Sequence, residues 1–251
     1  MQKYNLTFFD TLPSTNTALK EKAKQGAPEG EVVVARAQTM GKGSKGRSFF
    51  SPEGGLYFSL LLRPGQNLCR YLTPLAAVAV SRAIENLGFP DVKIKWVNDI
   101  YLNNKKVCGI LTEGVSDNEG NYYAVVGIGI NLSPPAGGFP SEIRDTATAL
   151  FSEPVPESVK NALLTSVLDN ISALYPTLSE KSFLAEYRAR SCLIGKSITI
   201  TSGNRVFEAV AVDINDDFEL VVKTAETGDI ALNSGDVQIK IACKNGQDRL
   251  Y

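Results

Sequence analysis

The amino-acid sequence has no histidine among its 251 residues. That absence excludes Ser-His-Asp and Cys-His catalysis, metal sites built on histidine, and a histidine general base. An enzyme made from this chain must work by positioning and charge stabilisation. The groups left for that work are lysine, arginine, aspartate, amides and, with them, Mg²⁺.

Cysteine is scarce and scattered. The four cysteines, Cys69, Cys108, Cys192 and Cys243, form no Cys-x-x-Cys pair. This spacing argues against a zinc site or a disulfide framework and is typical of a reducing cytoplasm. The N-terminus has no apolar signal-peptide segment, and apolar runs such as residues 75–80 are far too short to span a bilayer. We therefore expect a cytoplasmic protein with no membrane partner.

The chain also lacks an excess of charge of either sign. Its 26 lysines and arginines nearly balance 27 acidic residues, so no global field attracts nucleic acid or anionic membranes. A hydrophobic content of 43% is ordinary for a globular protein with a core, and the length predicts one large or two unequal domains. Electrostatic work must then come from local patches.

One such patch is the segment from Gly41 to Arg47, which alternates glycines with cations. No acidic residue occurs between Glu31 and Glu53. Glycine lets the backbone take positive φ and approach a ligand closely, but it is entropically costly to order. The segment is typical either of a solvated surface loop or of a cradle that orders around an anion, and taken alone it favours neither.

The order of predicted elements indicates an α+β fold with a mixed, mostly antiparallel sheet backed by helices. Strands are expected at 4–9, 31–37 and 56–62, and a run of hairpins is expected between 92 and 131. Helices are expected at 18–24, 73–87, 156–175 and 180–189. From about Gly195 the chain changes to short strands, which predicts a small β-barrel. The expected domains are 1–192 and 193–251.

Two further segments carry polar side chains at strand or helix ends. Ser14-Thr15-Asn16 is typical of a helix N-cap, and the same helix end offers free N–H groups to an anion or a carbonyl. Lys95-Trp96-Val97-Asn98-Asp99 places a cation, an indole, an amide and a carboxylate together. In a strand, Lys95 and Asp99 would face one way and Trp96 and Asn98 the other. Taken alone, this motif is typical of a polar strand end at a sheet edge.

Together, these segments and three more resemble the motifs of the biotin–protein ligases. The matching segments are Ser14-Thr15-Asn16, Gln38 to Arg47, Phe49-Phe50-Ser51-Pro52, Lys95-Trp96-Val97-Asn98-Asp99, Lys106-Val107-Cys108-Gly109-Ile110-Leu111 and Gly127-Ile128-Gly129-Ile130-Asn131. Six motifs in the right order make chance a poor explanation. The resemblance implies a synthetase-like catalytic domain of class II, followed by a C-terminal barrel of SH3 type. It is to the monofunctional members, which lack an N-terminal DNA-binding domain.

The resemblance implies a reaction in two steps. Biotin and ATP, with Mg²⁺, would give biotinyl-5′-AMP and pyrophosphate, and a lysine of a biotin carboxyl carrier domain of a carboxylase would then take the biotin. The cations and N–H groups of the loop suit the charge that develops on phosphate. Sequence-specific DNA binding is not expected, and a homodimer formed through sheet edges is left open.

The resemblance also implies a role for individual residues. Lys106, Arg47 and Asp99 would be catalytic, with Asp99 as the Mg²⁺ ligand. Biotin would be bound by Ser14, Thr15, Asn16, Gln38, Gly41, Lys42, Lys106 and Gly109. The nucleotide would be bound by Gly43, Lys45, Arg47, Phe49, Asn98 and Asn131.

Two departures and two rival functions qualify this reading. Ser44 stands where many members have arginine or another large polar residue, and Lys42 replaces the commoner arginine and loses its bidentate reach. One rival is a lipoate or octanoate ligase of the same architecture. The other is a non-enzymatic module that binds small molecules or peptides through the C-terminal barrel, which the lysines and arginines near Asn98 and Asp99 disfavour.

Overall fold

The computed structural model describes residues 4–116, 119–202, 205–225, 228–233, 236–241 and 249–250. Cys243 lies outside these residues. Three described cysteines, Cys69, Cys108 and Cys192, are free thiols. Among the described residues, no helix combines the length and the apolar character that a bilayer crossing requires.

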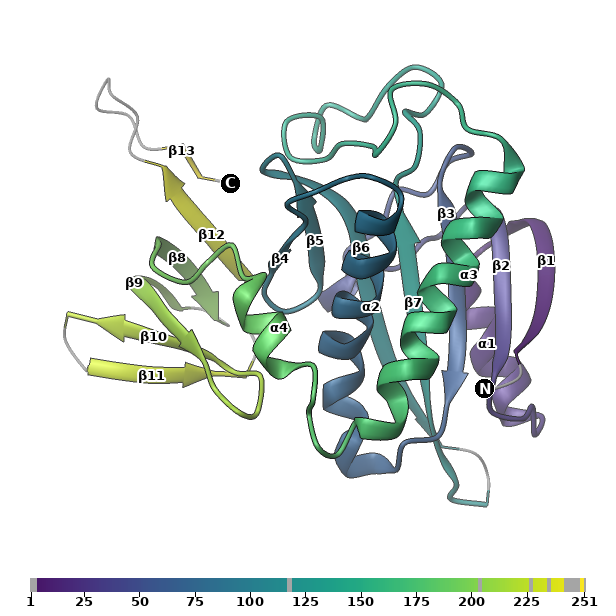
Figure 1. Ribbon diagram of the computed structural model, residues 1–251, viewed down its shortest axis with the longest axis horizontal. Helices are drawn as coiled ribbons and strands as arrows, with labels where there is room; N and C mark the ends of the chain where they lie inside the picture. The colour runs from purple at the N-terminus through teal and green to yellow at the C-terminus, as the bar shows by residue number, and fades with distance from the viewer. Residues whose placement is uncertain are drawn as a thin grey trace.

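A seven-stranded sheet forms the centre of the larger part of the molecule (Figure 1). Its strands are β1 (Asn5–Leu12), β2 (Glu31–Gln38), β3 (Leu56–Leu62), β4 (Lys93–Lys95), β5 (Asp99–Leu102), β6 (Lys105–Ser116) and β7 (Tyr122–Ile130). Their order across the sheet is β1-β2-β3-β7-β6-β5-β4. Only β1 and β2 run parallel among the described pairs, so the prediction of a mixed, mostly antiparallel sheet is confirmed.

Helices cover both faces of this sheet, because its central strands are apolar on both sides. All seven residues of β3 are buried. The helices are α1 (Thr15–Lys24), α2 (Leu72–Asn86), α3 (Glu157–Leu174) and the short α4 (Leu184–Ala189). α2 and α3 pack on one face and α1 on the other, so the core is divided into a large and a small cluster (Figure 1).

The predicted helices all form, with shifted ends. Short 3-10 turns occupy Ser44–Gly46, Gln66–Tyr71 and Tyr175–Thr177. α1 begins at Thr15, three residues before the predicted start, because Ser14 is its N-cap and accepts a hydrogen bond from the Thr17 N–H at 3.4 Å. This N-cap places Thr15 and Asn16 in the first turn, at the end of the helix that faces β6 and β7.

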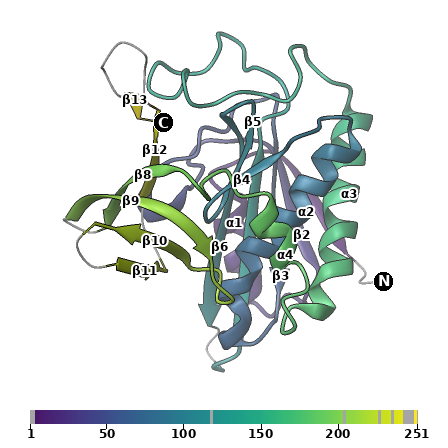
Figure 2. The same ribbon diagram turned by 60° about the vertical axis from the view of Figure 1, so that its left-hand side comes forward.

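The C-terminal part forms a second, six-stranded antiparallel sheet, as the change in sequence pattern predicts. Its strands are β8 (Ser197–Ser202), β9 (Arg205–Ile214), β10 (Leu220–Thr224), β11 (Gly228–Leu232), β12 (Asp236–Ile241) and β13 (Arg249–Leu250). Two views place it beside the β4 edge of the first sheet, next to α4 (Figure 1, Figure 2). A domain boundary between residues 192 and 193 stays a prediction.

The two sheets meet at the turn between β4 and β5. The Trp96 indole N–H donates to the Phe218 carbonyl at 2.8 Å, and the Tyr187 hydroxyl donates to the Val97 carbonyl at 2.9 Å. Phe218 stacks on Phe183 with ring centroids 5.2 Å apart. The expected continuous strand from Lys95 to Asp99 is wrong, because these two residues pair across a turn, and their side chains do not simply alternate.

Candidate active site

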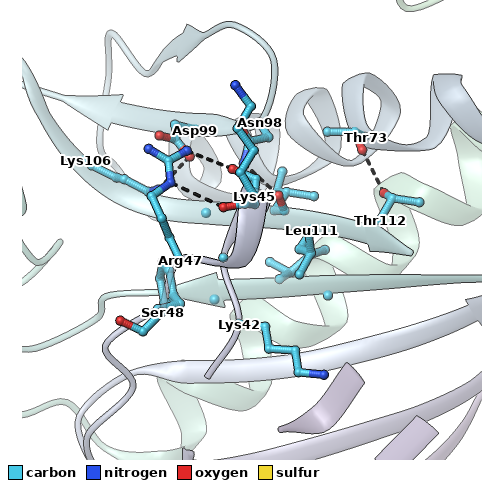
Figure 3. A pocket seen from close by; sticks show the side chains of 18 of the residues that line it. Lys42, Lys45, Arg47, Ser48, Thr73, Asn98, Asp99, Lys106, Leu111 and Thr112 are labelled. Atoms are coloured by element: carbon cyan, nitrogen blue, oxygen red, sulfur yellow. Dashed lines mark hydrogen bonds and ion pairs between the residues drawn. The ribbon is translucent and has the colours of Figure 1, made fainter. Parts of the chain in front are cut away.

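A cavity of about 710 Å³ lies on the α1 face of the first sheet. Its wall is built from the first turn of α1, the basic loop after β2, the turn between β4 and β5, and strands β6 and β7. Thr73 at the start of α2 and Asn233 from the C-terminal part complete it. Figure 3 shows Lys45 and Arg47 of the loop beside Asn98, Asp99 and Lys106, with Lys42 set apart from them. Segments more than 200 residues apart in sequence therefore share one cavity.

Three glycines of β6 and β7 make a floor without side chains. A Cβ added to Gly127 would lie 2.1 Å from the Asn16 Oδ1, and one added to Gly129 would lie 2.5 Å from a Phe49 ring carbon. A Cβ at Gly109 would also meet the Phe49 ring, at 2.9 Å. The Phe49 ring therefore lies directly on the backbone of the sheet. The same close approach would be open to a flat ligand.

Polar side chains line the end of the cavity nearest α1. The Gln38 Oε1 accepts a hydrogen bond from the Thr15 N–H at 2.8 Å and lies 3.1 Å from the Thr15 hydroxyl. The Gln38 Nε2 donates to the Ser51 hydroxyl at 2.9 Å, which in turn donates to the Phe49 carbonyl. These contacts fix the orientation of the Gln38 amide. This end can present both donors and acceptors to a polar ring.

Lys106 and Asp99 form an ion pair at the opposite wall, with the Lys106 Nζ 2.6 Å from the Asp99 Oδ1 (Figure 3). Backbone hydrogen bonds from the Lys106 N–H to Thr146 and from the Thr148 N–H to Lys106 hold the strand end in place. The Lys106 Nζ also lies 5.6 Å from the centre of the Phe49 ring. A cation is thus held over the glycine floor.

The basic loop closes on itself next to this pair. The Gly43 N–H donates to the Arg47 carbonyl at 2.7 Å, and the Phe49 N–H donates to the Gly41 carbonyl at 2.8 Å. The Arg47 guanidinium donates to the Ser44 hydroxyl at 3.0 Å, and Lys45 takes a left-handed conformation at φ 57°. Lys42, Lys45 and Arg47 all line the cavity. The loop therefore brings positive charge to it.

Lys95 is a cavity residue that the sequence reasoning did not assign to the site. Its ammonium donates to the Tyr101 hydroxyl at 3.4 Å, and it pairs in the β-ladder with Asp99. Burial lowers the pKa of Lys95, although the nearby Asp99 carboxylate opposes this. The signal was present, since Lys95 opens the same motif as Asn98 and Asp99.

Most of the predicted site residues line this one cavity. They are Ser14, Thr15, Asn16, Gln38, Lys42, Gly43, Lys45, Arg47, Phe49, Asn98, Asp99, Lys106 and Gly109. Gly41 and Asn131 do not line it. A Cβ on Gly41 would lie 2.3 Å from the Phe49 carbonyl, and the Asn131 amide, only 8% exposed, donates to the Thr148 carbonyl at 3.1 Å. Their contacts with ligands stay predictions, as do the roles of the others.

Comparison with protein families matches both parts of the chain. Residues 8–131 match the biotin/lipoate A/B protein ligase family, and residues 193–240 match the biotin protein ligase C-terminal domain. The bifunctional ligase/repressor BirA of Bacillus subtilis is 35% identical over 242 residues, which cover 94% of this chain and 74% of BirA. The biotin–[acetyl-CoA-carboxylase] ligase of Mycobacterium tuberculosis is 26% identical, over 89% of this chain and 85% of that ligase.

Solved structures give the same match over the whole fold. The biotin protein ligase of Aquifex aeolicus in complex with biotin and ATP superposes with a TM-score of 0.79 at 31% identity. The match covers 95% of this chain and 99% of that one. Both sheets, and not the larger one alone, are therefore shared with that structure.

Proposed function

This chain belongs to the biotin–protein ligase family, which makes it an ATP-dependent ligase, and we propose that its cavity joins biotin to AMP and then passes biotin to a carrier protein. The single observation that carries the proposal is the arrangement inside the cavity. A polar pocket at α1, a glycine floor, the Lys106–Asp99 pair and a basic loop all border this one cavity. That set of groups suits the biotin rings, a carboxylate and a phosphate.

In the first step, a biotin carboxylate oxygen attacks the α-phosphorus of ATP. The bond from that phosphorus to the bridging oxygen breaks, and pyrophosphate leaves with its electron pair. Lys106 would stabilise the charge on the carboxylate and the transferring phosphoryl group, while Arg47, Lys42 and Lys45 would face the phosphates. Ser14, Thr15, Asn16 and Gln38 would orient the biotin rings, and Phe49 and Asn98 would contact the nucleotide.

In the second step, the amine of a carrier lysine attacks the carbonyl carbon of biotinyl-5′-AMP. An amide bond forms, the nitrogen gives up a proton to solvent, the bond from the carbonyl carbon to the phosphate oxygen breaks, and AMP leaves with its electron pair. Lys106 lies where it could stabilise charge in both steps, since the carboxyl carbon reacts in each. We propose a biotin carboxyl carrier domain of a carboxylase as the partner, because the Mycobacterium tuberculosis relative is named for ligation of biotin to acetyl-CoA carboxylase.

Mg²⁺ would enter as the counter-ion of ATP. In the part of the chain that the structure describes, no group of three or more histidine, cysteine, aspartate or glutamate side chains could hold a metal by itself. Mg²⁺ needs only one or two carboxylates when phosphates and waters supply its other ligands. Asp99, with its carboxylate in the cavity wall beside Asn98, fits that requirement. Bound there, the ion would neutralise charge on the phosphates.

The compartment and other partners follow less directly. We propose the cytoplasm as the site of action, since the free thiols of Cys69, Cys108 and Cys192 suit a reducing environment. Absence of sequence-specific DNA binding stays a prediction, which a mobility shift on a biotin-gene operator would contradict. A homodimer stays open as well.

One assay tests the reaction against its closest rival. Pyrophosphate release from ATP should depend on added biotin and stay at background with lipoate or with no acid added. The polar end of the cavity at Thr15 and Gln38 provides the reason, since it suits a ring that both donates and accepts hydrogen bonds. A response to lipoate without a response to biotin would overturn the proposal in favour of a lipoate ligase.

A further inference from the structure

Glu113 lies just behind the polar end of the cavity without being part of its wall. It is on β6, two residues beyond Leu111, on the face of the sheet that α1 covers. Its Oε1 forms an ion pair with the Lys20 Nζ at 2.6 Å, and its Oε2 accepts a hydrogen bond from the Asn16 Nδ2 at 2.8 Å. Both carboxylate oxygens of Glu113 therefore bind side chains of α1.

These contacts determine which end of the Asn16 side-chain amide, the oxygen or the NH₂, faces Glu113. An ionised carboxylate can only accept hydrogen bonds, so it requires the NH₂ end of Asn16. The Asn16 Nδ2 also reaches the Leu111 carbonyl at 3.3 Å, while its Oδ1 lies 2.6 Å from the Ser59 hydroxyl. The Gly127 backbone leaves the space that this amide fills.

The orientation of Asn16 sets the direction of the hydrogen bonds that follow it. Ser59 has one hydroxyl proton, and the Asn16 Oδ1 requires it. Toward Thr15, whose hydroxyl is 2.7 Å away, the Ser59 oxygen then acts as an acceptor. The Thr15 hydroxyl gives its one proton to Ser59, so the Gln38 Oε1 accepts from the Thr15 N–H at 2.8 Å. One carboxylate outside the cavity thus determines how the Asn16 amide and the Thr15 hydroxyl present donors and acceptors inside it.

We propose that Glu113 is a positioning residue for biotin, which fixes through Asn16 and Ser59 the donor and acceptor pattern that meets the biotin rings. This inference rests on the proposed function. Burial by itself raises the pKa of Glu113, but hydrogen bonds from Lys20 and Asn16 outweigh it and leave the pKa below its ordinary value. The carboxylate is therefore ionised at neutral pH, as the acceptor role requires.

A second ion pair of α1 provides a matched control. Lys22 on α1 pairs with Glu31 on β2 at 3.1 Å, so it also fastens α1 to the sheet. Glu31 is not a cavity residue, and its carboxylate accepts hydrogen bonds from Asn5 and Lys22. A purely structural role for the Lys20–Glu113 pair predicts that both pairs behave alike when broken.

The test compares Glu113→Gln with Glu31→Gln by pyrophosphate release. In Glu113→Gln, one amide oxygen replaces the two carboxylate oxygens that accept from Lys20 and Asn16. The Lys20 ammonium is the stronger donor and binds this oxygen, so the amide NH₂ turns toward Asn16. We expect the KM for biotin to rise about tenfold, as for a lost hydrogen bond to a charged group, with the KM for ATP within about twofold. Glu31→Gln should leave both KM values within about twofold.

The double variant Lys20→Met with Glu113→Gln distinguishes a positioning role for Glu113 from a purely structural role. Without the ammonium, the glutamine oxygen can turn to Asn16, so the KM for biotin should recover to within about threefold of wild type. Lys20→Met alone, which leaves the carboxylate on Asn16, should stay within about twofold. Failure of the double variant to recover would overturn the inference, as would equal losses in Glu113→Gln and Lys20→Met.

The controls separate this inference from the function on which it rests. Wild type without biotin-dependent turnover would overturn the proposed function and the inference together. Wild type with turnover, and Glu113→Gln with an unchanged KM for biotin, would overturn the inference alone. Should Glu113→Gln fold poorly, the double variant and Lys20→Met still decide between the two roles.

Discussion

Two adjacent lysines of β6, Lys105 and Lys106, lie in different surroundings. Lys106 lines the cavity and pairs with Asp99, whereas the Lys105 Nζ donates to the Arg144 carbonyl at 3.4 Å, outside the cavity wall. Successive side chains of a strand point to opposite faces, so one position decides which lysine lines the cavity. The sequence motif selected Lys106, whose contact with substrate stays a prediction.

The residue-scale prediction follows from that difference. Lys106→Ala should lower kcat for pyrophosphate release by about 10²–10³, because it removes a cation aimed at the charge that develops in the transition state. Lys105→Ala is the control and should stay within about twofold of wild type. A Lys106→Ala enzyme with normal single-turnover rates would remove Lys106 from the proposed mechanism.

At the scale of elements, the basic loop has hydrogen bonds within itself that join Gly43 to Arg47 and Gly41 to Phe49. Lys42, Lys45 and Arg47 of this loop all line the cavity. An anion bound between these cations would favour the closed form of the loop. The loop would then act as a lid over the adenylate.

Limited proteolysis tests the lid. Trypsin should cleave after Lys42, Lys45 or Arg47 in the free protein, and biotin with ATP should slow this cleavage at least about fivefold, because a bound ligand stabilises the closed loop. Cleavage after the exposed Lys196, in the C-terminal part, serves as the internal control and should not change. Equal rates with and without ligands at all four positions would show that this loop is not the lid.

Prediction from sequence succeeded for elements and failed where distant segments meet. The sequence pattern predicted the helices that pack on the first sheet and the hairpins within it, because hydrophobic periodicity and turn residues are local signals. It treated Lys95 to Asp99 as a strand, although these residues form a turn held by Phe218, more than 100 residues later in the chain. No local pattern contains such a contact, so the turn could not be predicted from the sequence.

At the scale of the whole molecule, charged side chains join α2 to the segment that leads into the second sheet. The Arg190 guanidinium binds both oxygens of Glu85, at 2.6 and 2.8 Å, and also Glu186 at 2.8 Å. Arg82 on α2 completes the group by binding Glu186. Bidentate pairs of this kind are stronger and more specific than single ion pairs.

This network predicts that the free energy of unfolding falls as the pH is lowered into the acidic range. Hydrogen bonds from Arg190 lower the pKa of Glu85 below its ordinary value of 4.5. The stabilisation is therefore fully present above about pH 4.5 and is lost as the pH falls through the lowered pKa. Glu85→Gln should cost about 1 kcal/mol of unfolding free energy at pH 7, allowing for solvent screening, and less at pH 3.

Urea unfolding at pH 7 and pH 3 measures both values. Glu21→Gln is the control, since Glu21 pairs with Lys24 at the surface, where an ion pair contributes little. A Glu85→Gln penalty that stayed constant between the two pH values would contradict the assigned role of the Arg190 pair.

The chain contains a single tryptophan, and it is Trp96. Its ring is 6% exposed, its N–H is bonded to Phe218 of the second sheet, and its backbone continues directly into Asn98 and Asp99. Its fluorescence therefore reports on a single place, where the C-terminal sheet meets the turn beside the cavity. The unmodified protein carries its own optical probe, with which separation of the two sheets and binding of nucleotide could be followed in stopped-flow experiments without any attached dye.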